Sequence, residues 1–225
     1  MTQHPTAPSP EVLAARLAEI RERITGAGVD PDQVTVVAVT KTFPVEFAAS
    51  AMAAGLVDLG ENYAQDLATR ADEAEALRLT PRWHFIGGLQ RNKVKLLAGR
   101  VSLWQTIDRS SLVAELAKRD PGARLLVQVN TTGEAQKSGC DPAAAPGLVD
   151  EARDAGLDVA GLMTIGPTGG HHPAPAFEAL RELGHRCETA ELSMGMSGDY
   201  ELAVAAGATM IRLGSSLFGP RQARP

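Results

Sequence analysis

Apolar and polar positions along the chain alternate between two spacings, and this pattern predicts helices and strands in turn. Apolar residues recur at helical spacing over 11–24, and Ser9 followed by Pro10 is typical of a helix start. The segment 34–40 is nearly continuous in β-branched residues, as in a strand that is buried on both faces. Further strands are expected at 56–60, 83–87, 101–107, 124–130, 157–165, 190–196 and 209–214. Further helices are expected at 44–54, 61–78, 89–98, 110–119, 141–155, 174–188 and 198–206.

The order of these elements predicts the fold class. Strands that alternate with helices form right-handed βαβ units and a parallel sheet. Eight such units in 225 residues fit an α/β fold with a single (β/α)8 TIM-type barrel. The alternative is an open, doubly wound sheet, but no GxGxxG motif follows the first strand. We expect a flexible N-terminus at 1–10 and one barrel domain at 11–225.

Composition excludes several classes of protein. The net charge of −5 argues against non-specific binding of nucleic acid, which needs a basic face. No apolar run approaches the 18 residues of a membrane span, and the polar, proline-rich start lacks the apolar core of a secretory signal. Cys140 and Cys187 lie far apart without metal-ligand spacing, so no metal site is expected. These features predict a cytoplasmic protein.

Lys41 is the first candidate for chemistry. In barrels of this kind the active site lies at the carboxyl ends of the strands, and Lys41 is the one lysine placed within an apolar strand. Burial disfavours the ammonium form, and only the neutral amine attacks a carbonyl to form a Schiff base. The alternative is a lysine that reaches solvent or holds a carboxylate.

The second and third strands offer weaker candidates. Asn62 follows the second strand, where it either caps the next helix or binds a polar ligand. His84 lies in the third strand, where a satisfied core histidine competes with a ligand contact.

The last two strands end in groups that suit an anion. Ser197 and the run Gly214-Ser215-Ser216 supply hydroxyls and close backbone N–H groups of the kind that bind phosphate in these barrels. Arg212 lies one pleat before Gly214 and is expected to point into the barrel. A polar rim with an arginine that bridges strands is the alternative. An amine, a phosphate cradle and an inward arginine together outline a pocket for pyridoxal 5'-phosphate (PLP).

Ordered motifs extend this reading to most of the chain. They are Val39-Thr-Lys41, Gly60-Glu-Asn-Tyr63, Trp83-His-Phe-Ile-Gly87, Gln128-Val-Asn130, Leu192-Ser-Met-Gly-Met-Ser197 and Arg212-Leu-Gly214. In this order they resemble the family of pyridoxal phosphate homeostasis proteins. The resemblance implies a barrel like the N-terminal domain of alanine racemase (PLP fold type III), with PLP as a covalent aldimine on Lys41. It also implies ligand roles for further residues: phosphate contacts from Ser197, Gly214 and Ser215, a position near the pyridine ring for Arg212, and ring surroundings formed by Asn62, His84 and Met194.

The same resemblance bears on activity. The related racemases need a second acid/base, a tyrosine that an additional domain delivers, whereas Tyr63 and Tyr200 belong to helix starts here. The chain is therefore expected to be a monomeric, non-catalytic PLP carrier that serves intracellular PLP homeostasis and supplies PLP-dependent apo-enzymes. Lys137, on a loop at the barrel mouth, is a candidate for assisting PLP loading. A PLP-dependent amino-acid racemase or related enzyme is one alternative, and a Schiff-base aldolase that binds a phosphosugar without PLP is another.

Overall fold

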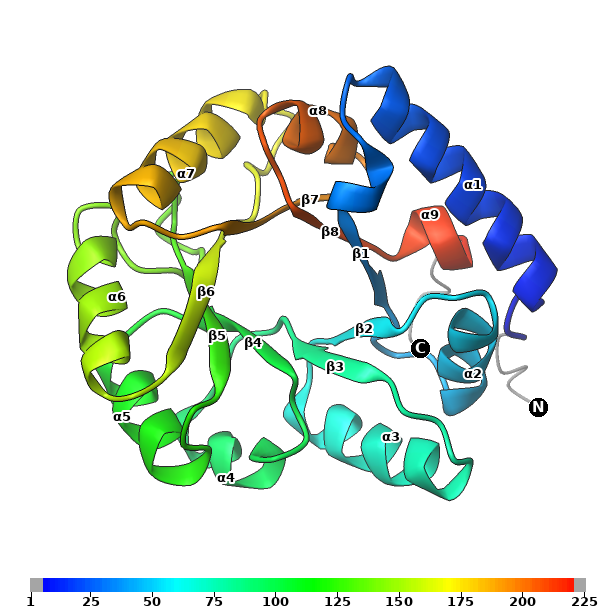
Figure 1. The fold of residues 1–225 in the computed structure, drawn as a ribbon, viewed down its shortest axis with the longest axis horizontal. Helices are drawn as coiled ribbons and strands as arrows, with labels where there is room; N and C mark the ends of the chain where they lie inside the picture. Colours follow the sequence, from blue (N-terminus) through cyan, green and yellow to red (C-terminus); the bar gives the residue numbers. More distant parts are fainter. Residues whose placement is uncertain (1–5, 221–225) are drawn as a thin grey trace.

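Eight parallel strands close into a barrel in the order β1 to β8, and β8 pairs with β1 (Figure 1). The computed structural model describes residues 6–220. The strands are β1 (Thr35–Val39), β2 (Asp58–Glu61), β3 (Arg82–Phe85), β4 (Leu103–Ile107), β5 (Arg124–Gln128), β6 (Asp158–Met163), β7 (Glu191–Met196) and β8 (Met210–Leu213). The predicted TIM-type barrel is confirmed.

Helices surround the barrel, as Figure 1 shows. They are α1 (Pro10–Gly26), α2 (Val45–Ala53), α3 (Ala64–Ala76), α4 (Val94–Leu97), α5 (Ser110–Arg119), α6 (Ala145–Asp154), α7 (Ala174–Arg186), α8 (Tyr200–Ala205) and α9 (Ser215–Phe218). Short 3-10 turns occupy Pro31–Gln33 and Arg91–Lys93. Helix α1 lies beside α9, so the beginning and the end of the described chain meet on one side of the barrel.

The helices expected at 89–98 and 141–155 differ most from their expected bounds. The stretch 89–98 divides into the turn Arg91–Lys93 and the four-residue α4. The expected helix at 141–155 begins only at Ala145, because the carboxylate of Asp141 accepts a hydrogen bond from the N–H of Ala143 (2.8 Å) and holds a turn there. Helix α9 was not expected, since four residues are too few to show a period.

The N-terminal boundary falls at the start of α1. Helix α1 begins at Pro10, with Ser9 as its N-cap, as the Ser9-Pro10 pair predicted. Of the N-terminal segment expected to be flexible, residues 1–5 lie outside the described residues. The carbonyl of Pro8 accepts a hydrogen bond from the Ser50 hydroxyl, and Ala7 packs against the core. This contact anchors the approach to α1 on α2.

The apolar core has two layers, which strand alternation produces. The larger layer lies between strands and helices and includes Phe85 and Trp104. The smaller layer lies inside the barrel: Val37, Leu103, Leu126, Met163 and Met210. Inside this barrel, next to the smaller layer, lie several buried polar side chains.

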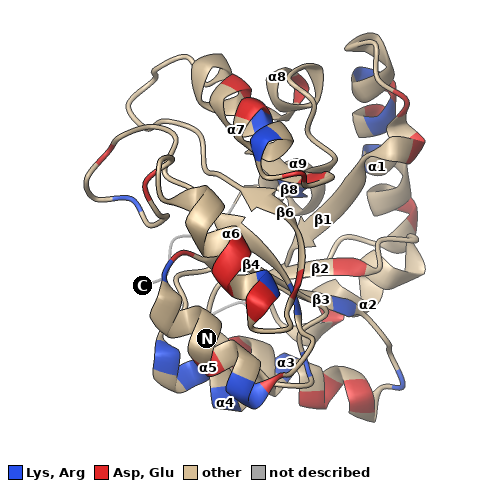
Figure 2. Cartoon of the chain, turned by 60° about the vertical axis from the view of Figure 1, so that its left-hand side comes forward, with Lys and Arg blue, Asp and Glu red and all other residues tan. Residues whose placement is uncertain are grey.

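Charges of both signs are interspersed on the outer helices (Figure 2). Within residues 6–220 no helix combines the length and the apolar character needed to cross a membrane. In the same part of the chain no group of His, Cys, Asp and Glu side chains is arranged to hold a metal ion.

Candidate functional site

A cavity of about 250 Å³ opens at the carboxyl ends of the strands, mainly between β1, β7 and β8. Its lining residues are Val39, Lys41, Asn62, Ile86, Ile165, Met196, Ser197, Gly198, Arg212, Gly214 and Ser215. Six of the predicted site residues thus lie together: Lys41, Asn62, Ser197, Arg212, Gly214 and Ser215. An amine, a guanidinium, an amide and two hydroxyls therefore face one small volume.

Lys41 lies in a tight turn, two residues beyond Val39, where β1 ends. It was expected within the strand itself. Val37 and Val39 point into the barrel, and the same alternation directs Lys41 towards the cavity. The turn is held by the Phe43 N–H, which donates to the Thr40 carbonyl (3.0 Å). Lys41 is partly exposed rather than fully buried, because it has passed the end of the strand.

A buried carboxylate lies next to this turn. Glu61, at the end of β2, accepts a hydrogen bond from the Thr40 hydroxyl (2.7 Å) and pairs with Arg70, whose Nε lies 2.9 Å from Glu61 Oε1. Burial raises the pKa of Glu61 to about 7, although the charges of Arg70 and Lys41 and the Thr40 hydrogen bond act in the opposite direction. Glu61 is therefore a group behind the cavity that titrates near neutral pH.

Arg212 points into the barrel, as predicted. Its Nη1 donates to the Ser193 hydroxyl (2.6 Å), and its Nη2 donates to the Thr164 carbonyl (2.8 Å). Burial lowers the pKa of Arg212 to about 10, while the charge of Asp199 opposes this shift. No carboxylate of the described residues lies within ion-pair distance of its guanidinium. A buried cation without an anionic partner suits an anionic or electron-rich ligand.

Ser197 and the start of α9 form one wall of the cavity. The Ser216 N–H donates to the Ser197 hydroxyl (3.2 Å), which joins the loop after β7 to α9. The loop is held in turn by Asp199, which accepts a hydrogen bond from the Met196 N–H (2.6 Å). Arg16 of α1 donates to the Leu217 carbonyl and secures α9 from outside. This wall has the hydroxyls and the glycine that a phosphate cradle needs.

His84 and Met194, two predicted ligand contacts, do not line the cavity. His84 points inward but lies one pleat below Ile86, which takes the position at the mouth. It lines a separate cavity at the amino ends of the strands. Met194 is fully buried in the outer core, because it follows the inward Ser193 and so faces the helices.

Several lining residues were not predicted from the sequence. Ile86, Ile165, Met196 and Gly198 supply the apolar part of the wall. Ile86 could have been found by counting one pleat onward from His84, and Ile165 by its place just after the sixth strand. Asn62 contributes a polar atom of interest: its buried Oδ1 has no hydrogen-bond partner in the described part of the chain.

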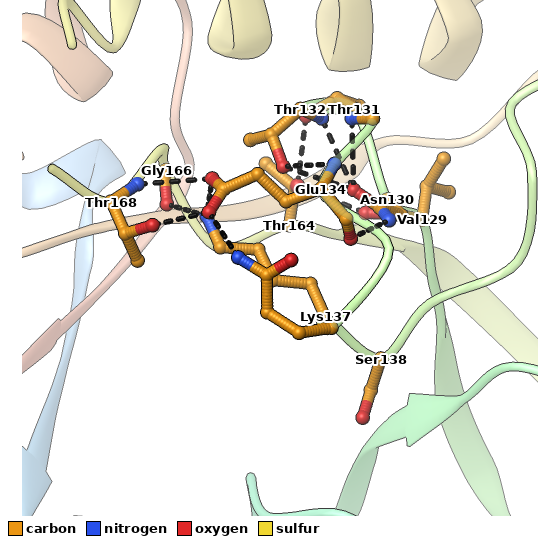
Figure 3. Close-up of polar contacts among 12 residues, drawn as sticks. Val129, Asn130, Thr131, Thr132, Glu134, Lys137, Ser138, Thr164, Gly166 and Thr168 are labelled. Carbon is orange, nitrogen blue, oxygen red and sulfur yellow. Dashed lines mark hydrogen bonds and ion pairs between the residues drawn. The ribbon is translucent and has the colours of Figure 1, made fainter.

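Lys137 lies on the loop after β5 and contacts Gly166, which follows the cavity-lining Ile165 (Figure 3). Its Nζ pairs with Glu134 Oε1 (2.6 Å) and donates to the Gly166 carbonyl. The Thr168 N–H also donates to Glu134 Oε1 (3.0 Å), so two loops are joined. The Lys137 hydrogen bonds lower the pKa of Glu134 to about 2, together with those from Thr168. Lys137 is thus largely buried in a loop contact and does not line the cavity.

Neither tyrosine lines this cavity. Tyr63 is the exposed N-cap residue of α3, and Tyr200 begins α8, as predicted. Tyr200 faces a neighbouring cavity of about 570 Å³ between α1 and α8, which shares Ser197 and Gly198 with the first.

Comparisons with known proteins identify the family of the chain. The family model for the alanine racemase N-terminal domain matches residues 10–222. The pyridoxal phosphate homeostasis protein of Pseudomonas aeruginosa is 39% identical over 220 residues, covering 94% of this chain and 95% of that protein. The human protein of the same name is 36% identical over 212 residues, covering 84% of this chain and 77% of its own length.

Solved structures give the same result. PipY of Synechococcus elongatus, solved with PLP bound, has a TM-score of 0.80 and 30% identity, with 92% of this chain and all of that chain covered. Alanine racemase of Corynebacterium glutamicum has a TM-score of 0.69 at 14% identity, covering 96% of this chain and 62% of its own, which shows a shared fold. The chain belongs to the family of pyridoxal phosphate homeostasis proteins, whose barrel is that of the alanine racemase N-terminal domain.

Proposed function

We propose that the chain binds PLP in the 250 Å³ cavity and serves PLP homeostasis as a carrier without turnover of its own. The observation that carries this proposal is the meeting of Lys41, Arg212 and the Ser197–Ser215 wall around one volume. The names of the relatives and the PLP bound in PipY support it. In this proposal the chain acts as a monomer in the cytoplasm and supplies PLP to apo-enzymes that depend on it.

The residues present suit each part of the cofactor. The hydroxyls of Ser197 and Ser215 and the backbone at Gly214 would hold the phosphate. Arg212 would face the pyridine nitrogen, and the unpartnered Oδ1 of Asn62 leaves an acceptor for a ring substituent. When bound, PLP supplies an electrophilic aldehyde and a ring that accepts electrons. Lys41 would hold it by condensation of the Nζ amine with the aldehyde, which forms a Schiff base and releases one water.

Two features support a carrier over a racemase. A guanidinium with a pKa of about 10 keeps its protons at neutral pH, so Arg212 donates a hydrogen bond to the ring nitrogen without protonating it. An unprotonated ring is a poorer acceptor of electrons from a carbanion. A second acid/base is also needed on the far face of the ring, and the cavity lining contains no tyrosine.

The test is PLP titration followed by borohydride reduction and peptide mass mapping. We expect an absorbance band at a longer wavelength than the band of free PLP. After borohydride reduction, we expect the adduct to map to Lys41. Lys41→Ala should lose both, whereas Lys118→Ala, at an exposed position on α5, should keep them. No band, or an adduct spread over Lys93, Lys95 and Lys118, would refute the proposal.

A second measurement separates carrier from enzyme. Amino acids incubated with the PLP-loaded protein in deuterated buffer should keep their α-proton. Exchange that Lys41→Ala abolishes would establish the racemase alternative. Reductive trapping of a phosphosugar on Lys41 without PLP would instead establish the aldolase.

A further inference from the structure

Five polar side chains form a continuous hydrogen-bonded chain inside the barrel. It starts at Asp58, at the amino end of β2, whose Oδ1 lies 3.1 Å from Nε2 of His84. His84 Nδ1 lies 2.8 Å from Nε2 of Gln105, and Gln105 Oε1 accepts a hydrogen bond from the Ser193 hydroxyl (2.7 Å). The Ser193 oxygen accepts in turn from Arg212 Nη1 (2.6 Å). The chain therefore joins the amino end of the barrel to the candidate ligand cavity.

The amide of Gln105 has one orientation that satisfies its neighbours. Its Nε2 carries two hydrogens, and two acceptors face it: His84 Nδ1 at 2.8 Å and the Met210 sulfur at 3.1 Å. Its Oε1 faces the Ser193 hydroxyl. A flipped amide would turn its oxygen towards the Met210 sulfur, which carries no hydrogen, and its NH2 towards a hydroxyl that already accepts from Arg212. The network thus fixes the amide of Gln105.

This orientation fixes the proton on His84. Because Gln105 donates to Nδ1, that nitrogen carries no hydrogen, and the ring proton lies on Nε2. The Nε2–H then donates to the carboxylate of Asp58, which Arg82 also holds through its Nε (2.8 Å). Each link of the chain therefore has a defined donor and a defined acceptor.

The middle of this hydrogen-bonded chain is closed to solvent. Gln105 and Ser193 are fully buried, and His84 is 3% exposed. The guanidinium of Arg212 has no carboxylate partner among the described residues, so Ser193 and the Thr164 carbonyl are the contacts that orient it. In a buried network, a wrongly turned member disturbs the next one because no solvent compensates the loss.

We propose that His84 is a positioning residue for Arg212, acting through its unprotonated Nδ1, Gln105 and Ser193. Its part in ligand binding is indirect: it aims the guanidinium that faces the cavity. Towards PLP this inference rests on the proposed function, whereas the hydrogen-bonded chain itself does not.

Two substitutions separate the hydrogen bond at Nδ1 of His84 from the one at Nε2. The amide of His84→Asn ends at the level of Nδ1 and can still offer an oxygen to Gln105, while its bond to Asp58 is lost. The amide of His84→Gln reaches the level of Nε2 and can still donate to Asp58, while the acceptor for Gln105 is lost. Both variants remove the ring, so a purely structural role of His84 predicts similar losses of stability and similar effects on the ligand.

The experiment combines nitrogen NMR of the ligand-free protein with PLP titration. In the wild type we expect the ¹⁵N shifts of His84 to report Nδ1 without a proton and Nε2 with one. The Arg212 side-chain signals should shift in His84→Gln and stay near the wild-type positions in His84→Asn. PLP affinity should fall about tenfold or more in His84→Gln, with a displaced absorbance band, and by less than about threefold in His84→Asn.

The outcomes separate the two proposals. A proton on Nδ1 in the wild type, or equal Arg212 signals and equal PLP affinities in the two variants, would overturn the positioning role. A wild type without a PLP band would overturn the proposed function, and the NMR comparison would still decide whether His84 orients Arg212. If a variant fails to fold, the wild-type His84 shifts remain decisive.

Discussion

Gly87 offers a direct test of how the ligand cavity is built. This residue follows β3 and lies against the backbone of Asn62, which lines the cavity. A Cβ at Gly87 would lie 1.9 Å from the Asn62 carbonyl oxygen and 2.7 Å from its Cα, whereas real Cβ contacts below 3.0 Å essentially do not occur. Gly87→Ala must therefore displace the Asn62 backbone by about 1 Å.

The size of the effect follows from this displacement. Overpacking at a buried site costs about 1–3 kcal/mol, and backbone atoms yield less readily than a side chain. A 1 Å shift also withdraws the Asn62 amide from its ligand contact, and one hydrogen bond contributes about 1 kcal/mol. We expect Gly87→Ala to lower the free energy of unfolding by about 2 kcal/mol and PLP affinity by about fivefold.

The neighbouring glycine is the matched control. Gly88 is exposed, and a Cβ there would have no atom within 4 Å. Urea unfolding followed by circular dichroism measures stability, and absorbance titration measures PLP affinity. Gly88→Ala should match the wild type in both. Equal stability of the two variants would refute the steric argument, and a destabilised Gly87→Ala with full PLP affinity would refute the role of Asn62.

Three further predictions concern the surroundings of the cavity. The folded-state pKa of Glu61, about 7, exceeds its ordinary value of 4.5. The wild type should therefore lose about 3 kcal/mol of stability relative to Glu61→Gln as the pH rises from 4.5 to above 7. Urea unfolding measures this, and a stability difference between the two proteins that stays constant with pH would contradict it. Lys137→Met should speed amide exchange at Thr168 about tenfold while leaving PLP affinity unchanged, and slower transfer of PLP to an apo-enzyme would support its predicted role in loading. Ser197→Ala should weaken PLP about tenfold yet leave pyridoxal, which lacks the phosphate, unaffected in a competition titration.

The sequence predicted the barrel well because its strands are buried on both faces and therefore read as continuous apolar runs. The lysine, the arginine and the serine wall were also found, since βα loops gather at one end of such a barrel. The depth of His84 was not predictable in this way. Whether an inward residue lies at the mouth or below it depends on strand stagger, which the spacing of apolar residues does not report.

Met194 illustrates a second limit. Its ligand role was implied by the family resemblance, whereas simple alternation from the inward Ser193 already places Met194 on the outer face. The pairing of β7 with β8 shifts register between Ser193 and Met196, and Gly195 has a φ of +91°. After this bulge the consecutive residues Met196 and Ser197 both line the cavity, which alternation does not predict. Helix α9 was not predicted, because a single helical turn is too short to show a hydrophobic period.

The closure of the barrel by β1 and β8 also sets a time order during synthesis. Lys41 and Arg212 belong to the first and last strands, so the cavity does not exist until nearly the whole chain has been made. At 5–20 residues per second, Lys41 emerges from the ribosome about 10–30 s before Arg212. During that interval its amine lacks the guanidinium and the serine wall of the finished cavity. If the proposed function holds, selective capture of the PLP aldehyde therefore begins only once the chain through Ser215 has been made.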